Sequence, residues 1–326
     1  MSRYSRPNPL WRPFDILLLH VAASLILLKH WRATWPFWFN HRRLPRVAVP
    51  QTFNDKVFWR KVVDRNPIFV TFNDKVRVRD WIAANLPELK LTRMIWHGKN
   101  PQDMPDKALT GPAMIKANHG CGYNLPYDGQ TPCRAEIVTK LEGWLGGVFG
   151  ESLSEWAYGE IPPQALIEEM LSFECGASPY NYNVHSANGK VLWVGIFFSE
   201  ETGQRKLGYF SETGDRLPVK MTDTMAAMDE SFRPGDLLIE AVNSAKVLSK
   251  GVDYVRCDFL VTDSTLWFNE MTTYSGSGHN KFSDPEYIDR LQKPWDLRKS
   301  WFLSNRQAGL REIYRKALLR ELSRRA

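Results

Sequence analysis

The stretch YVRCDFLVTDSTLWFNEM, residues 254–271, has the pattern of two short strands joined by the turn Thr-Asp-Ser. The first strand is expected to end at Val261, directly before this turn. Asp258 and Glu270 stand on the two strands. Thr272 follows two residues after Glu270, so it is expected on the same face of its strand.

These residues form a candidate magnesium site. Two carboxylates that face each other across a hairpin repel unless a cation or a basic group lies between them. Ligation by oxygen alone suits Mg²⁺. After Glu270 the chain enters a glycine-rich loop that reaches Gly278. An acidic pair on a hairpin is also typical of a solvated sheet edge, so the pattern of Asp258 and Glu270 leaves both interpretations open.

A second candidate feature is a lysine at the end of an apolar strand. Lys116 closes the predicted strand 113–116 and precedes the small-residue turn 118–122. Small residues let backbone N–H groups approach an anion closely, which favours a phosphate site. The alternative is a lysine that extends from an edge strand into solvent. The P-loop signature and a complete G-x-G-x-x-G are both missing from the sequence.

The hexapeptide TFNDKV occurs twice, at Thr52–Val57 and at Thr71–Val76. The first copy opens a predicted short helix over 53–65, and the second opens a predicted helix that starts near Asn73 and continues through residue 86. The sequence also predicts elements over 137–145 and 163–171, a hairpin over 183–198 with the turn Asn188-Gly189, and a helix over 234–251. The mixture predicts an α/β chain built of α+β subdomains.

Length and composition describe a globular chain. The 326 residues can bury a substantial core, as one compound domain or two to three subdomains. A hydrophobic content of 43% excludes a disordered chain. The four cysteines are scattered without a C-x-x-C pair, which indicates reduced thiols in the cytoplasm rather than a zinc site or a disulfide framework.

The net charge of +7 is unevenly distributed. Residues 1–46 carry eight Lys or Arg against one acid, and residues 298–326 carry nine against two. The body between them is therefore acidic. Basic ends on an acidic body fit an anionic membrane surface or a polyanion better than base readout, so no nucleic-acid partner is expected.

The N-terminal segment contains the apolar run 16–28, which is broken by His20 and flanked by basic residues and tryptophans. Its thirteen residues are fewer than the roughly 20 that cross a bilayer. Three arrangements stay open: a helix lying in the membrane surface, a helix packed on the protein's own core, and a true span. The closing stretch 310–325 has helical spacing with a basic face, and it could dock on the body or on lipid.

Five motifs in order carry a resemblance to a known family: Asn73–Arg79, Met114–Gly120, Ala165–Leu171, Val255–Phe259, and Phe268–Tyr274 with Gly278. This succession resembles the ATP-grasp fold, and in particular the TupA-like ATP-grasp proteins of bacterial surface-polysaccharide and teichuronopeptide synthesis. The likeness runs from about Phe53 to Asp289. It implies an ATP-grasp fold over this range, to which the sequence patterns add a basic hydrophobic helix at the N-terminus and a basic amphipathic helix at the C-terminus.

The resemblance distinguishes the two copies of TFNDKV. The second, with Lys75, stands where ATP-grasp proteins place their first phosphate lysine. The first, with Lys56, looks like the family's structural N-terminal helix motif. By position, the resemblance implies the remaining roles: Lys116 as the second phosphate lysine, His119, Gly120 and Gly122 as the loop over the phosphates, Glu168, Glu169 and Met170 as the adenine hinge, Asp258, Glu270 and Thr272 as Mg²⁺ ligands, and Arg256 as the charge that steadies the transferred phosphoryl group or its acyl product.

The chain departs from the family pattern at one place. Where the family commonly shows an acidic-aromatic-lysine triplet, this chain has Asn181-Tyr-Asn183, which removes two charges. The resemblance implies an ATP- and Mg²⁺-dependent ligase that activates a carboxylate as an acyl phosphate for an amine or similar acceptor. The asparagines favour an alternative, a nucleotide-binding scaffold that serves a glycosyltransferase complex. A glycosyltransferase is a third possibility.

The expected organisation has five parts: a basic N-terminal segment over 1–46, an N-terminal ATP-grasp subdomain over 47–110, a lid over 111–172, a C-terminal subdomain with the Mg²⁺ site over 173–295, and a basic helical tail over 296–326. The expected partners are ATP, Mg²⁺, a surface-polysaccharide or amino-acid substrate, a glycosyltransferase and a membrane surface. The expected location is the cytoplasm, at the inner face of the cell membrane.

Overall fold

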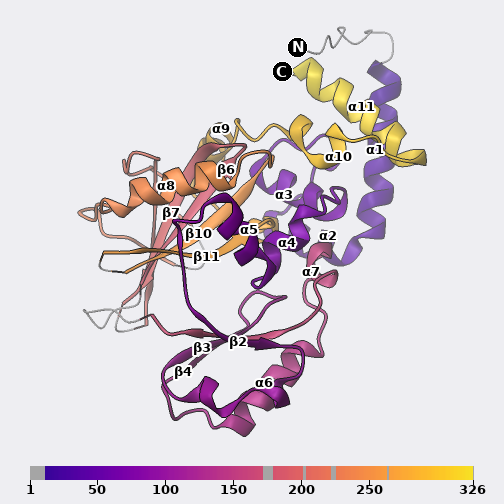
Figure 1. Ribbon diagram of the computed structural model, residues 1–326. Helices are drawn as coiled ribbons and strands as arrows, with labels where there is room; N and C mark the ends of the chain where they lie inside the picture. The colour runs from indigo at the N-terminus through magenta and orange to yellow at the C-terminus, as the bar shows by residue number, and fades with distance from the viewer. Residues whose placement is uncertain (1–11, 172–178, 201–202, 222–224, 263, 326) are drawn as a thin grey trace.

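Two β-sheets with helices packed on them organise the chain (Figure 1). The computed structural model describes residues 12–171, 179–200, 203–221, 225–262 and 264–325. The seven-stranded sheet lies in the upper part of Figure 1, and the four-stranded sheet forms a smaller unit below it. This mixed architecture confirms the predicted α/β class. The five-part division of the chain stays a prediction.

The larger sheet has the order β1-β11-β10-β6-β7-β8-β9. Helix α8 (Leu237–Leu248) packs on β6, β7 and β10. Asn188 and Gly189 both have positive φ, of 47° and 81°, which confirms the predicted hairpin turn. The strands of this sheet are β1 (Lys90–Leu91), β6 (Tyr180–Ala187), β7 (Lys190–Ser199), β8 (Arg205–Phe210), β9 (Ala226–Ala227), β10 (Val255–Val261) and β11 (Leu266–Thr272).

The smaller sheet has the order β2-β5-β3-β4 and is antiparallel throughout. Helix α6 (Arg134–Leu145) packs on it. Their shared apolar core, which includes Ile115, Ile137 and Ile167, is separate from the core of the larger sheet. The strands are β2 (Met94–Gly98), β3 (Ala113–Ala117), β4 (Asn124–Tyr127) and β5 (Ala165–Glu169).

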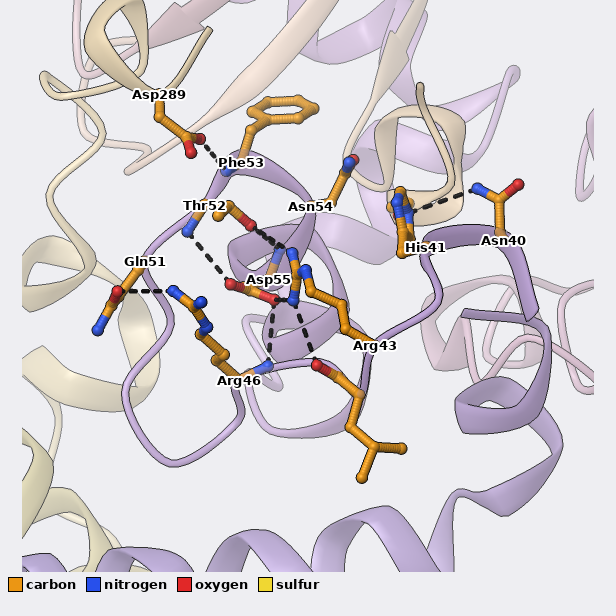
Figure 2. A network of polar contacts seen from close by, with 12 residues as sticks. Asn40, His41, Arg43, Arg46, Gln51, Thr52, Phe53, Asn54, Asp55 and Asp289 are labelled. Atoms are coloured by element: carbon orange, nitrogen blue, oxygen red, sulfur yellow. Dashed lines mark hydrogen bonds and ion pairs between the residues drawn. The ribbon is translucent and has the colours of Figure 1, made fainter. Parts of the chain in front are cut away.

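The first copy of TFNDKV starts helix α3 (Phe53–Val62), as predicted. Thr52 and Asp55 form a capping box, in which each side chain accepts a hydrogen bond from the backbone N–H of the other residue. Arg43 holds this helix start by donating to Asp55 at 2.6 Å and to Thr52 at 3.0 Å (Figure 2). The buried Lys56 donates to the carbonyl of Trp295 at 2.5 Å. The first copy therefore serves the structure.

The second copy has a different conformation. The sequence predicts one helix from about Asn73, but the chain forms α4 (Ile68–Asn73) and α5 (Arg77–Asn85) with a break between them. Asp74 ends α4 with an extended backbone, φ −88° and ψ 108°. Its carboxylate accepts from the backbone N–H of Val76 at 2.9 Å, which starts the next helix. Lys75 therefore lies in the break and belongs to neither helix.

The terminal helices lie side by side. Helix α1 (Arg12–Lys29) packs against α11 (Gly309–Arg325), and the two described ends of the chain meet near the top of Figure 1. Helix α2 (Trp31–His41) follows α1 at an angle of 100°. Among the described residues, no single helix has both the length and the apolar character needed to cross a membrane, whereas the bent pair α1 and α2 meets that criterion by length and composition alone.

Short helices complete the described chain. Helix η4 carries the glycine-rich loop, and α9 and α10 lie between this loop and α11. They are η2 (Pro101–Asp103), η3 (Asp106–Leu109), α7 (Trp156–Gly159), η4 (Ser275–Gly278), α9 (Pro285–Leu291), η5 (Leu297–Lys299) and α10 (Trp301–Ser304). Cys121, Cys133 and Cys257 carry free thiols, and Cys175 lies outside the described residues.

Candidate active site

The hairpin of β10 and β11 brings the acidic residues together. Asp258 lies opposite Glu270, and Arg256 lies opposite Thr272 in the same ladder. Because side chains alternate along a strand, all four lie on one face of the sheet. The Thr272 hydroxyl lies 3.3 Å from Asp258 Oδ2 and 3.4 Å from Glu270 Oε1. The three candidate metal ligands therefore converge on one point.

Arg256 supplies the positive charge beside the acidic pair. Its Nε lies 2.6 Å from Asp258 Oδ1 and its Nη2 lies 2.5 Å from Asp258 Oδ2, which makes a bidentate ion pair. The same Nη2 donates to the Thr272 hydroxyl at 3.0 Å and lies 3.7 Å from Glu270 Oε1. The guanidinium group therefore contacts every candidate ligand of the site.

The two carboxyl groups have different proton affinities. Burial raises the pKa of Asp258 to about 7, although the ion pair with Arg256 opposes this rise. Burial also acts to raise the pKa of Glu270, but the charges of Lys75 and Arg256 outweigh it and lower that pKa below its usual value. Glu270 is therefore the carboxylate that surrounding cations hold ionised.

Lys75 reaches this site from the break between α4 and α5. Its backbone N–H donates to the carbonyl of Asn118 at 3.2 Å, and its ammonium group donates to the carbonyl of Gly120. Burial lowers the pKa of Lys75, and the charge of Glu270 opposes that shift. Lys75 thus joins the turn after β3 to the acidic hairpin.

Lys116 lies on β3 and pairs with an acid of the neighbouring strand β5. Its Nζ lies 2.6 Å from Glu168 Oε2, and Arg79 of α5 lies 2.9 Å from the other carboxylate oxygen of Glu168. The Glu168 side chain is only 7% exposed, so its charge is balanced mainly by these two cations. In this conformation Lys116 is held by Glu168 within the smaller sheet.

The two remaining residues of the predicted hinge lie at the end of β5. Glu169 Oε1 accepts from the backbone N–H of Arg93 at 2.6 Å, and Glu169 N–H donates to the carbonyl of Arg93 at 3.0 Å. Met170 follows directly after the strand, at the edge of the described range that ends at residue 171. These contacts fix the end of the smaller sheet where the chain leaves it.

The turn after β3 is tightly packed at its start. His119 is buried, and burial lowers its pKa. A Cβ at Gly120 would lie 2.6 Å from the ring of Tyr123, so a side chain there requires that ring to move. Gly122 has φ of 75°, a conformation that favours glycine. The small residues of this turn therefore have steric reasons to be small.

The site residues lie in one electrostatic neighbourhood. Besides Asp258 and Arg256, the charged groups that act on the pKa of Glu270 include both Lys75 and Lys116. These groups come from the break after α4, from β3 and from the hairpin of the larger sheet. The fold thus gathers the lysines of one part of the chain around the carboxylates of another.

The residues present fit a magnesium ion and a triphosphate. The donors on the hairpin are two carboxylates and a hydroxyl, a set of hard oxygens that suits Mg²⁺. Among the described residues there is no group of three or more His, Cys, Asp or Glu that could hold a metal ion. Lys75, Lys116 and Arg256 place positive charge around Glu270, and a bound triphosphate would need such charge near its oxygens.

Two further residues help to organise the site. Both belong to the sequence motifs, but neither of them was assigned a role from the sequence. Arg79 holds the second oxygen of Glu168. Asn118 donates to Asp74 at 3.0 Å and accepts from the backbone N–H of Gln164 at 2.7 Å, which ties the Lys75 segment to the smaller sheet. Arg79 lies inside the motif 73–79, and Asn118 lies inside the motif 114–120. Their place in these motifs is the sequence feature that could have identified them as site residues.

The asparagines that depart from the family pattern lie next to the acidic pair. Asn183 on β6 is the direct partner of Asp258, and Asn181 is the partner of Leu260. On the other side of β6, Asn183 pairs with Gly195 of β7. The charge missing at position 183 would therefore stand beside Asp258, and the charge missing at position 181 would stand beside Leu260, two residues further along β10.

The sequence model of the TupA-like ATPgrasp family matches residues 55–293. This range contains every candidate site residue and both sheets. The chain has no match among curated proteins.

Solved ligases show a distant likeness. A crystal structure of D-alanine–D-alanine ligase from Bacillus anthracis has 15% identity and a TM-score of 0.42, covering 79% of this chain and 72% of that one. The same ligase complexed with ATP has 15% identity and a TM-score of 0.36, covering 63% and 54%. The ATP-grasp ligase PsnB with a phosphomimetic precursor variant, Mg and ADP has 12% identity and a TM-score of 0.37, covering 70% and 60%. In the last two comparisons the chain spans less than two thirds of the ligase.

Proposed function

We propose that this chain, which belongs to the TupA-like ATP-grasp family, is an ATP- and Mg²⁺-dependent ligase of cell-surface polysaccharide biosynthesis. ATP held with Mg²⁺ would supply the phosphoryl group that turns a carboxylate into an acyl phosphate, which an amine or similar acceptor then attacks with release of phosphate. The products are ADP, phosphate and the joined substrate. The carboxylate or the acceptor belongs to a surface polysaccharide or its precursor, and the other substrate is an amino acid or a related compound.

The convergence of cations on the acidic hairpin supports this proposal. A triphosphate carries several negative charges, and phosphoryl transfer is accelerated mainly by positioning and by stabilisation of charge. The charges of Lys75 and Arg256 both lower the pKa of Glu270, so both act on the same carboxylate. An anion between these groups would meet positive charge from two separate parts of the chain.

The hairpin residues hold the metal in this proposal. Asp258 and Glu270 provide the carboxylate ligands, and the Thr272 hydroxyl provides a neutral ligand or orients a water molecule. Arg256 now neutralises Asp258. With a divalent cation on the carboxylates, its guanidinium group would be available to the transferred phosphoryl group or the acyl product.

The smaller sheet and its turn hold the nucleotide. Lys116 lies on β3 beside the hinge residue Glu168, so a single rearrangement of their ion pair would present the ammonium group to phosphates and one carboxylate oxygen to the amino edge of adenine. Glu169 ends the strand at this hinge, and Met170 follows it. Gly120 and Gly122, with the buried His119, form the turn that would cover the phosphates.

The test is turnover by the purified full-length chain with ATP, Mg²⁺ and a panel of amino acids. The proposal predicts ADP formation that depends on an acceptor and on Mg²⁺, and it predicts loss of that turnover in Lys116→Ala and Glu270→Ala while both variants keep the wild-type circular dichroism spectrum. AMP as the product, or sugar-nucleotide binding in place of ATP binding, would contradict an ADP-forming ligase.

A second function is favoured by one observation. Asn183 is the neutral partner of Asp258, where the family commonly has a charged residue. A protein with a complete nucleotide site but a weakened catalytic centre would serve as a nucleotide-binding scaffold for a glycosyltransferase complex. Tight ATP binding without ADP release, in the presence of every acceptor tested, would support this scaffold. Restored turnover in Asn183→Lys would identify the asparagine as the cause.

A further inference from the structure

One face of the N-terminal helix pair is apolar and exposed. On α1, the side chains of Phe14, Leu17, Val21, Leu25 and Leu28 follow helical spacing and are 53–71% exposed. On α2, Trp31, Trp35 and Phe39 are 60–63% exposed. We call these eight side chains the docking face. So many exposed large apolar side chains on two consecutive helices are uncommon on a soluble monomer and mark an interaction site.

The opposite face of α1 is fixed to the body. Asp15, Leu19 and Ala23 follow one another at a spacing of four residues and are buried. The Asp15 carboxylate binds two arginines of α11, Arg320 at 2.5 Å and Arg324 at 3.1 Å. The hydrogen bond from Arg320 lowers the pKa of Asp15, so this carboxylate stays ionised next to its partners. Helix α1 is therefore attached through a buried carboxylate that would lose both arginine partners if the helix separated from α11.

This attachment argues against a membrane span. A span through α1 would carry Asp15 and the charged helix α11 into the hydrocarbon region, where ionised groups are expensive. Helices α1 and α2 also meet at 100°, so they cannot both follow the bilayer normal. A helix that keeps one face on the protein and turns the other outward can instead lie in the membrane surface.

The charges around the docking face fit an anionic surface. In residues 12–46 the single acidic residue is Asp15, which is fully buried. The exposed charges of this segment are therefore basic, and they include Arg12, Lys29, Arg32 and Arg42. Tryptophans with basic neighbours are typical of helices at the headgroup level. One acid of the body also lies near this border, since the exposed Glu151 is 3.8 Å from Arg32. A protein partner or a second copy of the chain would bury the same apolar side chains, but neither would account for the excess of basic residues along the two helices.

We propose that the docking face of α1 and α2 binds the surface of an anionic lipid bilayer, with both helices lying in the interface and neither crossing it.

The end of α2 connects this surface to the candidate active site. Asn40 donates to the carbonyl of His279 at 2.6 Å, and the His41 ring lies 2.9 Å from the carbonyl oxygen of Gly278. Gly278 ends the glycine-rich loop after the candidate metal ligands. A docked protein would hold this loop at a fixed distance from the membrane.

The experiment uses the full-length protein and sealed vesicles of phosphatidylcholine, alone or mixed with phosphatidylglycerol. Co-sedimentation measures binding of the wild type, of Leu17→Glu/Leu25→Glu, and of the matched control Val148→Glu/Ile239→Glu, which changes two other exposed apolar residues. Removing residues 1–46 is not a clean alternative, because the fully buried Phe37 packs on Phe58 in the main core.

The wild type and the control should bind the mixed vesicles, and the Leu17→Glu/Leu25→Glu variant should bind at least about tenfold more weakly. Binding should decrease with added salt and without phosphatidylglycerol. Equal sedimentation of this variant and the wild type would overturn the proposal, as would a wild type that stays in the supernatant. A dimer that the two glutamates dissociate, without vesicle binding, would assign the face to a second copy. Protection of an N-terminal tag from added protease inside the vesicles would show a span and overturn the interfacial arrangement.

Discussion

Asp258 and Glu270 lie directly opposite each other on neighbouring strands, yet their carboxyl groups have opposite pKa shifts. Burial raises the pKa of Asp258, whereas Lys75 and Arg256 bring that of Glu270 below its usual value in spite of burial. The difference arises because Lys75 reaches the pair from another part of the chain. This relationship links the acidic hairpin of the larger sheet to the Lys75 segment between α4 and α5.

The ion pairs of Glu168 should stabilise the smaller sheet. In Glu168→Gln, Lys116 and Arg79 would lose their shared counter-charge while they remain largely buried, with side-chain exposures of 13% and 18%. We expect a loss of about 2–4 kcal/mol in the free energy of unfolding. Chemical denaturation measures this, with the exposed Glu88→Gln as the control. Equal stability of the two variants would show that the Glu168 network contributes nothing measurable.

Gly120→Ala should disturb the turn after β3. The added Cβ would lie 2.6 Å from the Tyr123 ring, which stacks on Trp144 with centroids 5.3 Å apart. Overpacking of this kind costs about 1–3 kcal/mol. We expect a lower melting temperature and weaker ATP binding, because the carbonyl of Gly120 accepts from Lys75. The control is Gly111→Ala, whose Cβ meets nothing within 4 Å. The prediction fails if both alanines behave alike.

Lys56 should make stability depend on pH. Burial lowers the pKa of Lys56 to about 8, from 10.5 for an ordinary lysine. Between these values the unfolded chain keeps the proton and the folded chain releases it, so the free energy of unfolding rises as the pH increases through this window. Across the whole window the contribution is about 3 kcal/mol.

Urea denaturation at several pH values measures this rise in the wild type and in Lys56→Met. The variant should lack the part of the rise that Lys56 supplies, whereas the exposed Lys107→Met should keep it. Identical pH profiles for Lys56→Met and the wild type would mean that the buried ammonium group has an ordinary pKa.

Local patterns predicted much of the larger sheet. The two hairpins follow from alternation and turn residues, which act over a few positions. The break between α4 and α5 could not be predicted in this way, because the same hexapeptide also starts α3. Tertiary contacts decide between the two conformations: Asp74 in the second copy accepts from Asn118 of the smaller sheet, whereas Asp55 in the first caps its own helix.

The candidate site shows the same division. Register placed Asp258 opposite Glu270, and the motif order suggested Lys75 and Lys116. The pairing of Glu168 with Arg79 depends on where α5 lies relative to β5. No local sequence pattern predicts that position. The packing of α1 on the body likewise depends on distant residues, since the arginines that bind Asp15 lie 305 and 309 positions away in the sequence.

The dissociation constant of ATP in the presence of Mg²⁺, measured by calorimetric titration, tests the shared site most directly. The wild type and the exposed control Lys107→Met should bind equally. Lys116→Met and Glu270→Gln should each bind at least about tenfold more weakly, because each removes one charge from the same phosphate and metal site. Unchanged affinity in both variants, with their fold intact by circular dichroism, would contradict a single site in which the lysines and the acidic hairpin hold one nucleotide.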